Sequence, residues 1–410
     1  MLSGSQGQLC DLHYPVQMPD LSADRPSPTG PETAAGTDPR QRAWMEVSAS
    51  AVEHNARALK QLLASDCSLM AVVKADGYGH GAETVARAAI CGGATSLGVA
   101  TLQEGIELRR AGLELPVLVL GNLTQPEELR ACLHWQLMPT LSSMREALLC
   151  QNLASGSGRE FTVQLKLDTG MTRLGCHWED GERLTEAILQ LDQLNLGGVY
   201  SHLALADGEL EGHADRITRL QQERFEAVTR KHRQQGLQRH LANSAGALRD
   251  RSLHHDQVRV GLALYGHAPS AHLEQSLDLQ PAMTVKARVS LIREVAAGVG
   301  VSYGHRFVTS RPSRLAVIGI GYADGVSRCL SGQIHALHRG QPLPQVGAIT
   351  MDQLMLDVTD HPDLESGDVV TLLGEDDQQV IRPQDWAELS GSIPWEVLCG
   401  FKHRLPRLVV

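Results

Sequence analysis

One lysine stands where its chemistry could be unusual. Lys74 follows an apolar run over residues 69–73 and precedes Tyr78 and three glycines, in the sequence KADGYGHG. The run is typical of a buried strand, and the glycines are typical of a loop at its carboxyl end. Burial disfavours the charged form of a lysine, so its pKa falls and its amine becomes suited to Schiff-base formation. An ordinary surface lysine before a glycine turn explains the same stretch.

Other candidate site residues lie on or after further short apolar runs. They are Lys166, Asp168, Arg173, His202, His240, Asn243, Ser244, Arg259 and Gly261. Each alone is typical of a structural residue at a strand end. Together they favour one site, because the carboxyl ends of barrel strands meet at one face. Ser244 with small neighbours indicates an anion site, and a phosphate beside a Schiff-base lysine suggests pyridoxal phosphate (PLP).

These runs belong to about eight alternating strand–helix units over residues 50–270. Strands are predicted at 69–73, 97–100, 116–121, 162–168, 198–202, 238–241 and 258–260, and helices at 50–63, 82–91, 102–111, 125–134, 181–192 and 214–235. Ser50 and Glu53 predict a capping box at the start of the first helix. The alternation predicts a (β/α)₈ barrel, TIM-barrel-like, over residues 41–275. An open doubly wound sheet is the competing architecture, but eight strand–helix units of this length fit a barrel better.

The pattern changes after residue 275. Residues 285–291 alternate apolar and polar side chains, further apolar runs lie at 315–319 and 369–373, and few helices are evident. This predicts a mostly β C-terminal domain over residues 276–410, and the strand at 43–47 is a candidate member of it. Residues 1–40 hold six of the 18 prolines. They are predicted to form a disordered N-terminal extension without the apolar region of a secretory signal.

Composition excludes several classes of function. The chain has 410 residues and a net charge of −10, which argues against nucleic acid or a membrane surface as partner. No apolar run approaches the ~18 residues of a membrane-spanning helix. The eight cysteines lie in no C-x-x-C spacing, so no metal site is predicted. Free thiols are expected, in a reducing, cytoplasmic location.

Seven segments together resemble the PLP-dependent alanine racemases of fold type III. They are VVKADGYGHG (72–81), LKLDTGMTRLG (165–175), ANSA (242–245), RVG (259–261), VSYG (301–304), GYADG (321–325) and TMDQ (350–353). They occur in the family's order from about residue 42 to 410, so only the N-terminal extension lies outside. The resemblance implies PLP as cofactor, L- and D-alanine as substrates, and a supply of D-alanine for peptidoglycan.

The resemblance also assigns roles to the barrel residues. Lys74 would carry PLP and act as one of two bases. Tyr78, Asn243, Ser244 and the backbone of Gly261 and Leu262 would hold the cofactor, chiefly its phosphate. Arg259 would face the pyridine nitrogen with His240 behind it, His202 would lie near the ring, and Arg173 would contact the phenolic oxygen. Lys166 corresponds to a lysine that many members carry as a carbamate and that positions this arginine.

A second group of roles falls on the C-terminal domain. Tyr303 would be the second base and Met351 would bind the substrate carboxylate, both supplied by the other subunit of a homodimer. Tyr322 would form the inner gate of the access corridor, and Asp352 would stand behind the substrate residues. Trp395 occupies the place of a tyrosine that contacts the phosphate in most members, and Ala348 replaces a common corridor arginine.

Three other functions remain open. Trp395 and Ala348 leave room for a broader-specificity amino-acid or serine racemase. A fold-related PLP decarboxylase also pairs a barrel with a β domain, although the lysine motif and the tyrosine of VSYG argue against it. A non-enzymatic PLP-binding protein would resemble the barrel alone, and the domain that carries Tyr303 argues against that function.

Overall fold

The computed structural model describes residues 38, 40–233, 236–401 and 403–410. The predicted extension over residues 1–40 therefore lies outside the described residues, apart from residues 38 and 40. Within the described ranges, no helix combines the length and the apolar character needed to cross a membrane.

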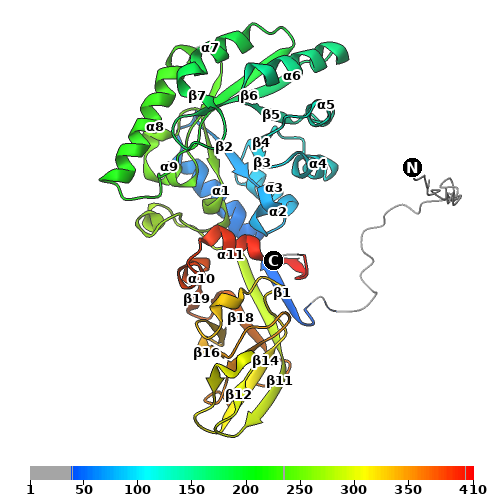
Figure 1. Cartoon of the computed structure of the whole chain (residues 1–410), viewed down its shortest axis with the longest axis vertical. Coiled ribbons are helices and arrows are strands. Elements are labelled where there is room, and N and C mark those ends of the chain that lie inside the picture. The colour runs from blue at the N-terminus through cyan, green and yellow to red at the C-terminus, as the bar shows by residue number, and fades with distance from the viewer. Residues whose placement is uncertain (1–37, 39, 234–235, 402) are drawn as a thin grey trace, which may run out of the picture. The chain divides into compact units, whose positions relative to one another are not determined.

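The barrel consists of eight parallel strands in the described part of the chain (Figure 1). In spatial order they are β10 (Gln257–Val260), β2 (Ser68–Val72), β3 (Ser96–Val99), β4 (Val117–Asn122), β5 (Met138–Leu141), β6 (Phe161–Asp168), β8 (Leu194–Tyr200) and β9 (Gln238–His240). Two backbone hydrogen bonds tie β9 and its extension to β10: Asp256 N–H to the Arg239 carbonyl and Arg259 N–H to the Ala242 carbonyl, both 3.0 Å. The sheet thus nearly closes, which confirms the predicted barrel and excludes the open sheet.

Amphipathic helices cover the outside of the barrel (Figure 1). They are α1 (Ala49–Leu62), α3 (Ala82–Cys91), α4 (Leu102–Arg110), α5 (Pro126–Trp135), α6 (Met144–Ser157), α7 (Trp178–Leu189), α8 (His213–Thr229) and the short α9 (Ser244–Arg249). The predicted capping box was wrong, because Ser48 caps α1 by accepting a hydrogen bond from Ala51 N–H. The predictions missed β5, a short strand that contains Pro139, since proline weakens the strand signal.

The C-terminal domain is built on one sheet of the order β19-β18-β15-β16-β17-β14-β11-β1-β20. Its strands are β1 (Ala43–Val47), β11 (Met283–Val295), β14 (Ser313–Ile318), β15 (His335–His338), β16 (Gln341–Val346), β17 (Leu354–Asp357), β18 (Val369–Asp376), β19 (Gln379–Ile381) and β20 (Arg407–Val409), with the hairpin β12 (Gly300–Val301) and β13 (Phe307–Val308) beside them. β1 lies between β11 and β20, so the first strand that the structure describes belongs to this sheet, as predicted for residues 43–47. The boundary at residue 275 stays a prediction.

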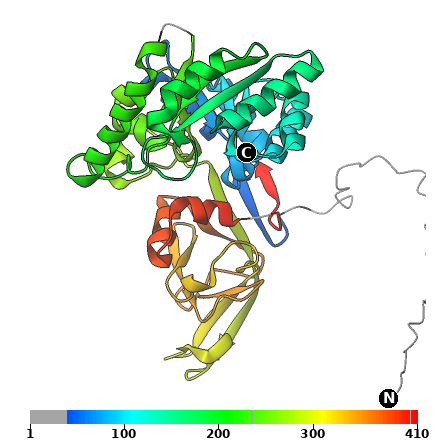
Figure 2. The same ribbon diagram turned by 45° about the horizontal axis from the view of Figure 1, so that its top comes forward.

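Two helices that the sequence pattern did not reveal lie in this domain, α10 (Pro383–Ser390) and α11 (Pro394–Gly400). Figures 1 and 2 both show α11 at the boundary between the barrel and the sheet. Trp395, on α11, packs against the hydrophobic cores of both. The helix therefore brings residues from the last part of the chain to the carboxyl end of β2, at the mouth of the barrel.

Candidate active site

Lys74 begins α2 (Lys74–Tyr78), which is a left-handed helical turn directly after β2 and Val73. Residues 75–78 all have φ between 51° and 61°. The left-handed conformation costs a residue other than glycine about 1–2 kcal/mol, so contacts from the surrounding structure must stabilise the turn. The segment predicted as a glycine loop is therefore an ordered turn with Lys74 at its start and Tyr78 at its end.

Aromatic side chains stabilise this turn from inside the molecule. His80 Nδ1 lies 3.0 Å from the Gly77 carbonyl and 3.1 Å from the Tyr78 carbonyl. Burial lowers the pKa of His80 to about 4, so the ring is neutral at pH 7 and donates from Nδ1. The Tyr78 ring stacks on Tyr265 with ring centroids 4.8 Å apart, and the Tyr265 hydroxyl donates to the Val72 carbonyl. Tyr265, which the sequence analysis passed over, thus fixes the Tyr78 ring.

Tyr78 and Ser244 meet at Gly261. The Ser244 hydroxyl accepts hydrogen bonds from Gly261 N–H at 3.0 Å and from Ala263 N–H at 3.4 Å. A Cβ atom at Gly261 would lie 2.5 Å from the Tyr78 hydroxyl oxygen, so only glycine allows this approach. Asn243 stands beside them and caps α9. Two hydroxyls and nearby backbone amides are neutral donors that fit a phosphate group.

Arg259, on β10, is a buried cation whose hydrogen-bond partners are neutral groups. Its guanidinium donates to the carbonyls of His240 at 2.8 Å and Leu241 at 3.1 Å, and it lies 3.1 Å from His240 Nδ1 and 3.4 Å from His202 Nδ1. Burial lowers the pKa of Arg259 to about 10, so it stays charged at neutral pH. Burial and then the Arg259 charge keep the pKa of His202 well below its ordinary value. Burial and the Arg259 charge do the same to the pKa of His240, so both rings are neutral and fix the guanidinium without cancelling its charge.

A second cation lies next to the first. Lys166, only 6% exposed, has its pKa lowered to about 8, first by burial and then by Arg259, Arg173 and Lys74. Lys166 Nζ and Arg259 Cζ lie 5.3 and 5.1 Å from the centroid of the Tyr200 ring. Tyr200 is a residue that sequence reasoning missed, although it precedes His202 in the same predicted strand. The barrel mouth is therefore strongly positive and suits an anionic cofactor.

Arg173 and Lys74 share this positive field. The Asp168 Oδ1 atom accepts hydrogen bonds from the backbone N–H groups of residues 170–172, each at 3.0 Å, and so shapes the loop that leads to Arg173. Burial, followed by the charge of Arg173, lowers the pKa of Lys74. Lowering the pKa increases the fraction of neutral amine at a given pH. Lys74 thus has the environment that the sequence analysis expected for a nucleophilic lysine.

The predicted residues of the C-terminal domain form a different, exposed set. Tyr303 is 70% exposed, Met351 53% and Tyr322 42%. Tyr303 begins the short helix η5 (Tyr303–His305), which follows β12 after Ser302, and Figures 1 and 2 show β12 at the end of this domain remote from the barrel. Asp352 pairs with Arg404 at 2.6 Å. The structure therefore gathers the barrel residues but leaves Tyr303 apart from Lys74 of the same chain.

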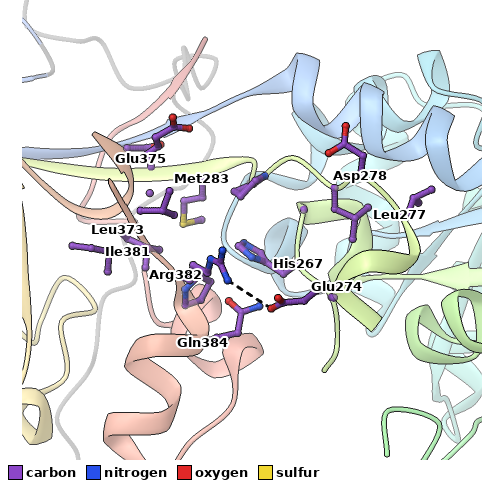
Figure 3. Close-up of a pocket in the computed structure, with 18 of the residues that line it drawn as sticks. His267, Glu274, Leu277, Asp278, Met283, Leu373, Glu375, Ile381, Arg382 and Gln384 are labelled. Atoms are coloured by element: carbon purple, nitrogen blue, oxygen red, sulfur yellow. Dashed lines mark ion pairs between the residues drawn. The ribbon is translucent and has the colours of Figure 1, made fainter. Parts of the chain in front are cut away.

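A cavity of about 590 Å³ between the end of the barrel and the β domain is separate from this site (Figure 3). It lies between segments within residues 266–284 and 373–384, and Arg382 and Glu274 pair across it at 3.8 Å. None of the sequence-predicted site residues lines this cavity. The barrel residues that the sequence predicts to hold the cofactor lie at the barrel mouth, outside this cavity.

Models of known protein families match both domains of this chain. The model described as "Alanine racemase, N-terminal domain" matches residues 47–269, and "Alanine racemase, C-terminal domain" matches residues 282–409. An alanine racemase of Prochlorococcus marinus is 59% identical over 375 residues, which cover 91% of this chain and 97% of that protein. One of Nostoc sp. is 48% identical over 375 residues, with coverages of 90% and 96%.

Solved structures of alanine racemases also match most of this chain. Alanine racemase of Clostridium difficile 630 superposes with a TM-score of 0.84 at 33% identity, covering 91% of this chain and 96% of that chain. Alanine racemase of Bartonella henselae with covalently bound pyridoxal phosphate gives a TM-score of 0.79 at 30% identity, covering 90% and 99%. The matches extend over both domains and include every segment in which the predicted site residues lie. The chain belongs to the alanine racemase family.

Proposed function

We propose that this chain interconverts L-alanine and D-alanine with PLP as cofactor, as its relatives' names and family indicate. One structural observation carries the proposal: Arg259 is a buried cation that would face the cofactor ring. Because an arginine does not give up its proton readily, Arg259 would leave a pyridine nitrogen beside it largely unprotonated. That favours return of the proton to the α-carbon and disfavours transamination. Neither a decarboxylase nor a non-enzymatic PLP-binding protein is favoured by the relatives.

The residues at the barrel mouth fit PLP. Tyr78, Ser244 and the backbone of Gly261 and Leu262 would hold the phosphate, with Asn243 and Trp395 beside it, and Arg173 would contact the phenolic oxygen. When bound, PLP withdraws electrons from the α-carbon of an amino acid joined to it and so acidifies the α-proton. Lys74 holds or donates the proton on one face of this carbon. His202 and His240 fix the position of the Arg259 guanidinium, whose charge would act on the cofactor ring from within the barrel.

The opposite face of the α-carbon requires a second base, and we assign this role to Tyr303 of a partner subunit. The support is its exposure of 70% and its position beyond β12, at the end of the domain that is remote from the barrel. Met351 would bind the substrate carboxylate from the same partner, with Tyr322 at the gate and Asp352 behind. The proposal thus includes a homodimer with shared sites. It also includes a cytoplasmic location and the supply of D-alanine for peptidoglycan.

Racemase activity on purified holoenzyme tests the proposed function. L-alanine should lose its optical activity, and in D₂O the α-proton should exchange for deuterium at a comparable rate. Parallel assays with L-serine and L-lysine measure how far Trp395 and Ala348 broaden the substrate range. Release of CO₂, or bound PLP without any racemisation, would contradict the proposal.

Lys166 is expected to carry a carbamate. Its pKa of about 8 leaves a fraction of neutral amine at neutral pH, and its neighbours are cations that would stabilise a negative group. The neutral amine adds CO₂ and releases one proton, so occupancy should rise as the pH rises through about 8. Native mass spectrometry in bicarbonate should show an added mass of one CO₂ that acid removes and that Lys166→Met lacks. An unmodified wild-type chain at pH 9 would contradict the expectation.

A further inference from the structure

The left-handed turn at Lys74 is also stabilised from outside the barrel, by the C-terminal end of the chain. Asp76, in the middle of the turn, places Oδ2 2.5 Å from Arg407 Nη1. Its other oxygen, Oδ1, accepts a hydrogen bond from Ala82 N–H at 2.9 Å. Arg407 begins β20, which pairs in parallel with β1. One carboxylate therefore joins the turn that carries Lys74 to the sheet of the other domain.

The chain just after the turn lies close to the same C-terminal region. Gly79 has φ of 85°, and a Cβ atom there would lie 2.6 Å from the Leu398 carbonyl oxygen of α11. A Cβ atom at Gly81 would lie 3.8 Å from Arg407 Cδ. The backbone from the turn to the start of α3 thus rests against α11 and the Arg407 stem. Its conformation depends on where that last segment of the chain lies.

Each supporting contact acts on a different part of the turn. Glu104 accepts a hydrogen bond from Ala75 N–H at 2.7 Å, and His80 binds the carbonyls near the end of the turn. Both of these residues belong to the barrel. At Asp76, by contrast, the charged support comes from Arg407. Without it, the Ala82 hydrogen bond would have to keep the Asp76 side chain in place.

The surroundings of Arg407 point to a local rather than a general role. Its side chain is 27% exposed, that of Asp76 is 53% exposed, and Arg407 Nε is buried with no hydrogen-bond partner in the described part of the chain. An ion pair as exposed as this contributes little to global stability. Burying an unpaired N–H is unfavourable. A contribution to global stability therefore does not explain why Arg407 lies here. A role in shaping the turn explains its position better.

We propose that Arg407 is a positioning residue for Lys74. Through Asp76 it keeps residues 75–78 left-handed and so fixes the Lys74 amine relative to the Tyr78 hydroxyl. The inference rests on the proposed role of Lys74 and adds the last strand of the chain to the parts that shape the site. Arg407 itself acts through Asp76, and its effect on the reaction is indirect.

Backbone hydrogen exchange tests the proposal independently of catalysis. In Arg407→Gln, peptides covering residues 74–82 should exchange at least about fivefold faster than in wild type, while peptides from β4 and α5 stay unchanged. Arg407→Lys, which keeps the charge, should restore part of the protection. Arg311→Gln is the matched control, because Arg311 also pairs with an aspartate of the β domain. Since substrate is absent, the result stands even if the chain racemises nothing.

Kinetics of the holoenzyme provide the second readout. Arg407→Gln and Asp76→Asn should each lower kcat about tenfold with little change in KM, since a misplaced base slows the reaction step more than substrate binding. Asparagine suits the Asp76 position because it tolerates left-handed geometry and retains the Oδ1 acceptor. The double variant should be no slower than either single variant. Unchanged exchange at residues 74–82 in Arg407→Gln, or fully additive kinetic effects, would overturn the proposal.

Discussion

Replacing Lys74 by alanine is expected to lower kcat for alanine racemisation at least about a thousandfold, because both the covalent tether and a general base are lost. Lys74→Arg should lose as much, since a guanidinium stays protonated at the pH of the assay. Lys231→Ala, which removes an exposed lysine on the outside of the barrel, should keep the wild-type rate. A Lys74→Ala holoenzyme within tenfold of wild type would contradict the assignment.

A second measurement, which depends on the pKa of Lys74, tests the same assignment. Burial and Arg173 lower the pKa of Lys74, whereas the hydrogen bonds that Lys231 donates to Glu182 and Glu186 raise the pKa of Lys231. The neutral amine is the reactive form. In the PLP-free chain, acylation of Lys74 by a small anhydride should therefore begin at lower pH than acylation of Lys231. Peptide mass spectrometry across pH would measure both in one sample, and the reverse order would count against the assignment.

The sequence predicted the position of Lys74 but not the shape of the segment that follows it. The apolar run before Lys74 and the glycines after it marked a strand end correctly. A left-handed turn through Ala75 and Tyr78 runs against local preference, and the groups that impose it, Glu104 and Arg407, lie far away in the chain. Local patterns can show where a turn lies, but they cannot supply distant contacts.

The same limit applies to the aromatic residues of the site. Arg259, His202 and His240 were found because charged or titratable groups at strand ends attract attention. Tyr200 and Tyr265 were missed, because a tyrosine in an apolar stretch is as typical of a core as of a site. Their functional significance comes from what they touch, namely the two cations above Tyr200 and the Tyr78 ring above Tyr265. Packing of this kind becomes visible only in three dimensions.

The shared site predicts that two variant chains, each defective as a homodimer, form an active heterodimer. This is the largest effect that we expect from the shared site. Tyr303→Phe alone should lower kcat by about 100- to 10,000-fold, as expected for loss of a general acid–base group. A heterodimer of Lys74→Ala and Tyr303→Phe chains has one site that lacks both groups and one that has both. Purified through two different tags, it should therefore have about half the activity of wild type, although each parent homodimer is inactive.

A matched heterodimer gives the opposite result and makes the test decisive. When a chain with both substitutions pairs with a wild-type chain, each shared site lacks one base, so this heterodimer should be nearly inactive. If Lys74 and Tyr303 of one chain worked together, the wild-type chain would keep its site, and the two outcomes would be reversed. The position of Tyr303 beyond β12, exposed and remote from the barrel, favours the shared arrangement. The two heterodimers have the same composition, so a difference in activity between them can come only from how the two bases are distributed between the chains.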